Sequence, residues 1–81
     1  MKLVAWSFNL EGEKIHPEDD WNIEVTSFDE ATAVIASELV NTSSDEFLSA
    51  ALRQWFTHGK VENLHEGGDV FWNVELIEVA E

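Results

Sequence analysis

Residues 27–59 read SFDEATAVIASELVNTSSDEFLSAALRQWFTHG, and this segment carries the clearest structural pattern in the chain. Ser27 and Glu30 form a capping box, in which the serine side chain accepts a hydrogen bond from the N3 amide and the glutamate reaches back. The pattern predicts a helix that runs to about Val40 and buries one apolar stripe. The stripe consists of Phe28, Ala31, Ile35 and Leu39.

A second helix is predicted after a break at residues 41–42. Ser43 and Glu46 repeat the capping box, and Gly59 suits the left-handed position that follows a helix. Acidic residues in both predicted first turns favour these helices, because they interact with the helix dipole. The apolar face of the second helix comprises Phe47, Leu48, Ala51, Leu52 and Trp55.

Two strands are predicted before the helices, because residues 3–10 and 21–26 alternate in polarity. The composition of residues 11–20, EGEKIHPEDD, predicts a long acidic loop that joins the two strands as a hairpin. In the first strand the inward residues are Val4, Trp6, Phe8 and Leu10, and the outward ones are Ala5, Ser7 and Asn9. In the second strand Trp21, Ile23 and Val25 face inward, and Asn22, Glu24 and Thr26 face outward.

The chain after the helices predicts an edge strand at 60–65, a hairpin turn at 66–69 and a last strand at 70–79. The inward face of the last strand holds Val70, Trp72, Val74 and Leu76. Ile77 and Val79 fall on the opposite face, which predicts a bulge near Leu76–Ile77.

These elements predict an α+β fold: one small two-layer domain over residues 1–81, with an antiparallel sheet of three to four strands and two helices on one face. The predicted order is β-β-α-α-(β)-β. We expect Trp6, Trp21 and Trp72 to meet Trp55 in a single core.

The composition excludes several classes of protein. Among 81 residues, 17 are Asp or Glu and 4 are Lys or Arg, which gives a formal net charge of −13. A protein that binds DNA or RNA by neutralising phosphates needs a basic patch, so direct nucleic-acid binding is not expected. The chain has no cysteine, which excludes disulfides and zinc-thiolate sites. It has no apolar run that would span a membrane and no signal-peptide pattern. We therefore expect a cytoplasmic protein, located in the host cell if a phage encodes it.

No pattern in the chain predicts a catalytic residue, a metal site or a cofactor. His16, His58 and His65 lie on different predicted elements and share no ligand spacing. The run Glu18-Asp19-Asp20 lacks the loop spacing of a calcium site. We therefore expect a protein that is not an enzyme.

The acidic residues outside the helix starts are the predicted partner-binding residues. Carboxylates two residues apart on a strand are separated by about 6–7 Å, which is close to the spacing of phosphates along a nucleic-acid strand. Such an array complements a groove lined by Lys and Arg. The predicted contacts are Glu11, Glu13, Glu18, Asp19, Asp20, Glu24, Glu75 and Glu78, with Glu81 in the tail and Ser7, Asn9, Asn22 and Asn73 beside them. The candidate apolar anchors are Ile15, Phe56, Phe71 and Ile77, which fit the inward stripes least well.

In size and composition alone, the chain resembles inhibitors that phages and mobile elements encode, such as anti-restriction and anti-CRISPR proteins. The resemblance implies an acidic, DNA-mimic-like binding protein. Its partner would be a basic protein, namely a nucleic-acid-binding protein or a nuclease complex. Two alternatives remain open: an immunity protein or antitoxin that neutralises a nuclease, and a small acidic accessory or halophilic protein with no inhibitory role.

Overall fold

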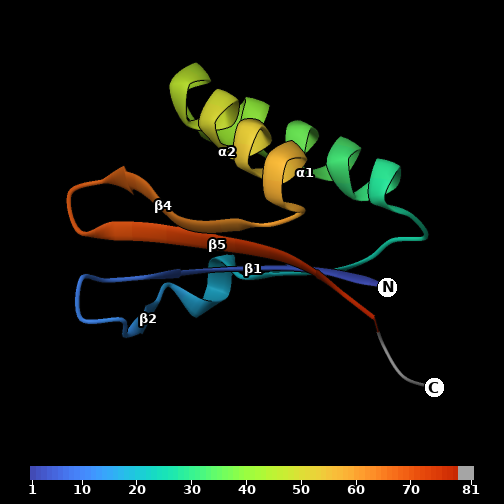
Figure 1. Ribbon diagram of the computed structural model, residues 1–81. Helices are drawn as coiled ribbons and strands as arrows, with labels where there is room; N and C mark the ends of the chain where they lie inside the picture. The colour runs from blue at the N-terminus through green and yellow to red at the C-terminus, as the bar shows by residue number, and fades with distance from the viewer. Residues whose placement is uncertain (79–81) are drawn as a thin grey trace.

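The computed structural model describes residues 1–78, which form an antiparallel sheet with two helices packed on one side of it (Figure 1). The predicted α+β fold is therefore confirmed. In chain order the elements are β1 (Lys2–Phe8), β2 (Lys14–Ile15), the short 3-10 helix η1 (Pro17–Asp19), β3 (Trp21–Glu24), α1 (Phe28–Thr42), α2 (Asp45–His58), β4 (Val61–Gly67) and β5 (Val70–Ile77).

Strand β1 lies inside the sheet, because it pairs along both of its edges. On one edge it pairs with β5, which in turn pairs with β4. On the other edge it pairs first with β3 and then with the two residues of β2. The predicted hairpin between the first strand and residues 21–26 is confirmed, as is the hairpin that ends the chain. The prediction of a plain loop over 11–20 is wrong, since β2 and η1 form within it.

Both helices begin with a serine cap, as predicted, but the second cap lies one residue later than expected. Ser27 Oγ accepts from the Glu30 amide at 3.1 Å. Ser44 Oγ accepts from the Phe47 amide at 3.2 Å, whereas Ser43 ends α1 by donating its amide to the Leu39 carbonyl. Ser43 therefore cannot start α2, because it is the C-cap of α1. Gly59 ends α2 with φ 74°, as predicted.

The burial of β1 is the reverse of the prediction. Leu3, Ala5 and Ser7 face the helices and are almost inaccessible, whereas Val4, Trp6 and Phe8 lie on the far face and are half-buried. The helix-side core already contains the bulk of Trp55, Ile35 and Phe47, and Trp21 and Trp72 pack at its side. Small side chains on the central strand leave room for these large ones. Trp6 is therefore not part of a four-tryptophan core, and Leu10 lies outside β1 with 72% of its surface exposed.

The irregularity predicted in the last strand lies in its neighbour. β5 pairs with β1 without interruption from Phe71 to Ile77. Ile77 therefore lies on the outer face by the ordinary alternation of a strand, without a bulge. The register shifts occur in β4, between Val61 and Leu64 and again between His65 and Gly67. Asn63 has φ 53° there, and its amide donates to Asn73 Oδ1 at 2.8 Å. Val79 and Glu81, which the sequence placed in the last strand and the tail, lie outside the described residues.

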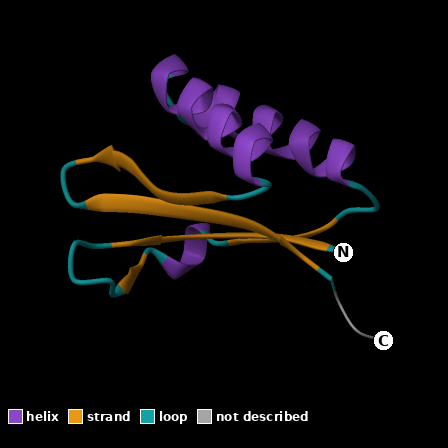
Figure 2. Ribbon diagram, viewed as in Figure 1, coloured by secondary structure: helices purple, strands orange, loops and turns teal. Residues whose placement is uncertain are grey.

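The layers are simple to follow when the ribbon is coloured by secondary structure (Figure 2). The sheet has one face under α1 and α2, and its buried residues join those of the helices in one cluster. We refer to the opposite face as the outer face. Neither helix within residues 1–78 is long and apolar enough to cross a membrane.

Candidate functional site

A groove of about 480 Å³ opens on the helix side of the sheet. It lies where the end of α1 and the start of α2 approach η1, β4 and β5. We call it the acidic groove, because its floor is apolar and its rim carries carboxylates. The floor is made by Trp21, Leu39, Phe47, Ala51, Leu64, Trp72 and Val74. The rim carboxylates are Glu18, Asp19, Asp20, Glu38 and Glu66.

The sheet register brings the two tryptophans of the floor to the same face. Trp21 is the first residue of β3 and lies opposite Ala5, while Trp72 lies opposite Ser7 on one side and Leu64 on the other. Ala5 and Ser7 lie on β1 between the two indole rings, and their small side chains leave space there. Ser7 Oγ donates to the Ile15 carbonyl at 2.9 Å, which ties β2 to β1 next to this floor.

Two of the five rim carboxylates are held in place, Glu66 by a hydrogen bond and Asp20 by an ion pair. Glu66 Oε2 accepts from the indole Nε1 of Trp72 at 2.7 Å, so a floor residue fixes a rim residue. Asp20 Oδ2 lies 2.6 Å from Lys14 Nζ. The other oxygen of Asp20 is shielded from solvent and has no hydrogen-bond partner within residues 1–78. A carboxylate oxygen left in this condition gains free energy from any donor that reaches it.

The acidic groove therefore combines a cation-attracting rim with a surface for apolar groups. The two carboxylates of Glu38 and Glu66 come from α1 and β4, and the other three come from η1 and the residue after it. Lysine and arginine match such a site, because each carries a long apolar stem below its charge. An arginine also stacks favourably on the face of a tryptophan.

The predicted partner-binding residues do not form one continuous array. Glu18, Asp19 and Asp20 line the acidic groove. Glu24 and Glu75 lie on the outer face, opposite Lys2 and Val4 of β1. Glu11 and Glu13 lie at the hairpin end, where Asn9 Oδ1 accepts from both of their amides. Glu78 follows β5. The sheet therefore separates the groove acids from those of the outer face.

Sequence reasoning missed Glu38 and Glu66 as members of the site. Glu38 precedes Leu39 of the buried stripe, so it stands at the border of the apolar face of α1. Glu66 was interpreted only as part of a turn. Their approach to η1 depends on the packing of elements that are distant in sequence, which no local pattern reveals.

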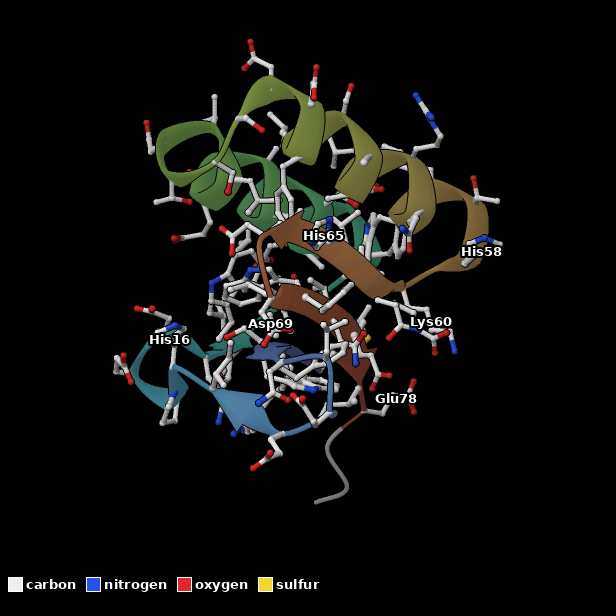
Figure 3. All side chains as sticks on the ribbon, turned by 90° about the vertical axis from the view of Figure 1, so that its left-hand side faces the viewer. His16, His58, Lys60, His65, Asp69 and Glu78 are labelled. Carbon is white, nitrogen blue, oxygen red and sulfur yellow. The ribbon has the colours of Figure 1, made fainter. Side chains whose placement is uncertain are left out.

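The three histidines lie apart from one another (Figure 3). His65 Nε2 lies 2.9 Å from the Gly68 carbonyl and its ring packs on Phe71, so it stabilises the β4–β5 turn. His16, Glu18 and Asp19 each place one ligand atom within 4.8 Å of the others, but all three are exposed. Three such ligands are about half of the six to eight oxygens that calcium takes.

A hydrogen bond joins the two turns of the sheet that precede β2 and β5. Asp69 Oδ1 accepts from the Leu10 amide at 3.0 Å.

The chain was compared with protein-family models, with curated proteins and with solved structures, and nothing in any of the three matches it.

Proposed function

We propose that this protein is a stoichiometric binding protein that occupies a basic, nucleic-acid-binding site on a partner protein. The observation that carries the proposal is the acidic groove, in which five carboxylates from α1, β4 and the η1 segment surround an apolar floor. The net charge of −13 supplies a long-range field that steers a basic partner toward the molecule.

The mechanism has two parts. Carboxylates of the rim pair with Lys or Arg side chains that otherwise hold phosphates, which blocks the nucleic acid from the same site. The stems of those side chains, or an apolar neighbour, lie on Trp21 and Trp72 in the floor. Charge alone gives rate and specificity more than affinity, so the apolar floor supplies the anchor that a stable complex needs.

The first experiment asks whether such a partner exists. The tagged protein is used to capture partners from lysate at about 50 mM and about 500 mM NaCl, because screening weakens contacts between exposed charges. We expect a basic nucleic-acid-binding protein at low salt that is lost at high salt. The captured partner should then release its nucleic acid when one equivalent of this protein is added. Recovery of no basic partner at low salt would contradict the proposal.

A matched pair of variants then tests the groove. The variant E18K/D19K/E38K reverses three rim charges, and E11K/E13K/E78K reverses three others outside the groove. Each replacement changes the charge by two, so both variants have a formal net charge of −7 instead of −13. We expect the first to slow association and raise Kd at least tenfold more than the second. Equal effects would show that net charge, and not the groove, governs binding.

A further inference from the structure

The outer face of the sheet is apolar along its central strands, although neither α1 nor α2 covers it. Val4, Trp6 and Phe8 of β1 lie there, and β5 adds Phe71 and Ile77. None of these five residues belongs to the helix-side core or packs against it. Phe8 and Phe71 are stacked with ring centroids 5.7 Å apart, so the outer face has an apolar centre of its own.

A sheet with one solvated face normally alternates between apolar and polar residues along each strand. β1 does not, because Leu3, Val4, Ala5 and Trp6 are apolar on both faces. Continuous apolar sequence is typical of strands that are covered on both sides. Within residues 1–78 only one side of β1 has a cover.

The charges of the outer face favour a second copy of the same chain as the cover. The strand register places four charged side chains on this face, Lys2, Lys14, Glu24 and Glu75. They comprise two cations and two anions, and Lys14 is also paired with Asp20 at 2.6 Å. Within residues 1–78, the paired strands therefore place two of the four basic residues of the chain on the same face as two acids, Glu24 and Glu75. This face therefore adds little local repulsion to the overall repulsion between two chains of charge −13. A basic partner gains little attraction there and is better complemented by the acidic groove.

Pairing through the β4 edge does not offer an easy alternative route to a dimer. β4 is an edge strand, but its two register shifts and the positive φ of Asn63 distort it, and Lys60 stands at its start. Distorted edges and lysines are devices that oppose strand addition.

We propose that two copies of the chain pack outer face against outer face, with the aromatic cluster of Trp6, Phe8 and Phe71 at the centre of the contact. Packed sheets lie about 10 Å apart, and each copy keeps its helices on the outside of the sandwich. Both acidic grooves stay accessible in this arrangement. The dimer would present two of them, which raises the avidity for a partner with repeated basic sites.

The test is the oligomeric state of the whole chain, measured by sedimentation velocity between about 1 µM and about 1 mM protein at low and high NaCl. We expect a dimer whose population increases with salt, because screening reduces the repulsion between two anionic molecules. A complex with a basic partner has the opposite salt dependence, so failure of this proposal is distinguishable from failure of the proposed function. A monomer at the highest concentration in both salts would overturn the dimer.

Variants locate the contact. F71S and W6S should each weaken dimerisation at least tenfold, while F56S should not, because Phe56 lies on α2 with 65% of its surface exposed. Far-UV circular dichroism and thermal melts check that each variant is folded. If W6S does not fold, the dimerisation of F71S alone tests whether the outer face forms the contact. Loss of the dimer in F56S, or its persistence in folded F71S, would place the contact elsewhere and contradict the proposal.

Discussion

At the scale of single residues, the one fully buried tryptophan is satisfied by a short relay of hydrogen bonds. The indole Nε1 of Trp55 donates to Thr32 Oγ1 at 2.7 Å, and that hydroxyl donates to the Phe28 carbonyl at 2.9 Å. Phe28 in turn stacks on the Trp55 ring at a centroid distance of 5.0 Å. The relay therefore joins the first turn of α1 to the core of α2.

Replacing Thr32 by valine should destabilise the protein although the shape of the side chain is retained. The buried indole N–H loses its acceptor, and an unpaired buried donor costs about 1–3 kcal/mol. Urea denaturation measures the loss. The control is T57V, at an exposed position of α2, where a change within about 0.5 kcal/mol is expected. A T32V variant as stable as wild type would show that the relay contributes nothing.

A second residue-scale feature is the exposed pair of Lys60 and Glu62, whose Nζ and Oε1 atoms are 2.8 Å apart. The hydrogen bond from Lys60, followed by its charge, lowers the pKa of the Glu62 carboxyl. The same contact raises the pKa of Lys60. The stabilisation by Glu62 is thus present above the unfolded pKa and lost as pH falls through the lower folded pKa. The stabilisation by Lys60 is present below its unfolded pKa and lost as pH rises through its folded one.

An NMR titration of the Glu62 carboxyl carbon tests this coupling. In K60Q the titration midpoint of Glu62 should move upward toward its ordinary value, because the donor and its charge are gone. In K2Q, whose altered residue lies on another strand, the midpoint should stay where it is in wild type. An unshifted midpoint in K60Q would mean that the two side chains are not paired in solution.

At the scale of elements, the start of α2 offers the sharpest comparison between sequence and structure. Ser43 and Ser44 are adjacent, and the capping-box spacing to Glu46 favours Ser43. Ser44 is the cap because Ser43 is already used to end α1. Local sequence rules treat each helix separately and cannot see that two helix ends compete for the same residue.

Alanine substitutions at the two serines should differ accordingly. S44A removes the acceptor of the Phe47 amide and should cost about 1 kcal/mol, as N-cap serines do. S43A keeps its backbone bond to Leu39, so a change within about 0.5 kcal/mol is expected. Thermal melts of the two variants provide the comparison. If S43A lost more stability than S44A, Ser43 and not Ser44 would be the N-cap of α2.

The strands show where sequence reasoning succeeds and where it fails. Residues 21–24 and 70–77 have polar residues on one face only, so their orientation was predicted correctly. β1 is apolar on both faces, and the larger side chains of Val4, Trp6 and Phe8 were assigned inward. In the structure these three residues lie on the outer face, because large side chains from α1 and α2 already fill the space between the helices and the sheet. Hydrophobic size alone does not orient a strand that is apolar on both sides.

At the scale of the whole molecule, the composition predicted an acidic surface but not its organisation. The acids of residues 18–20 were identified as contact candidates, and the structure places them on the rim of a groove. Glu38 and Glu66 join them only because α1 and β4 pack near η1. The floor depends on the same packing, because Trp21 and Trp72 are 51 residues apart in the sequence and come from different strands. A site made from long-range contacts can be predicted only once the topology is known.

The charge of −13 makes a prediction about the stability of the fold as a whole. The molecule measures 36 × 27 × 22 Å along its principal axes. At about 0.01 M salt the Debye length is about 30 Å, so carboxylates on opposite sides repel one another, whereas at about 1 M it is about 3 Å and only neighbours interact. Self-repulsion of this kind destabilises the compact state. The Tm should therefore rise with NaCl, by about 4–8 °C for each kcal/mol of repulsion that screening removes.

Calorimetric melts at the two salt concentrations measure this effect, and the variant E11Q/E13Q, with a formal charge of −11, provides the control. Its Tm should depend less steeply on salt than that of wild type, because fewer charges remain to be screened. We expect a cooperative melt even at about 0.01 M salt, since the core described above does not rely on screening. A chain adapted to high salt would be unfolded there, and the acid excess would then be a solubility adaptation. We expect the protein to be folded at both salt concentrations, its stability to rise with salt and its complex to weaken with salt. These three results together would assign the excess of acidic residues to partner binding.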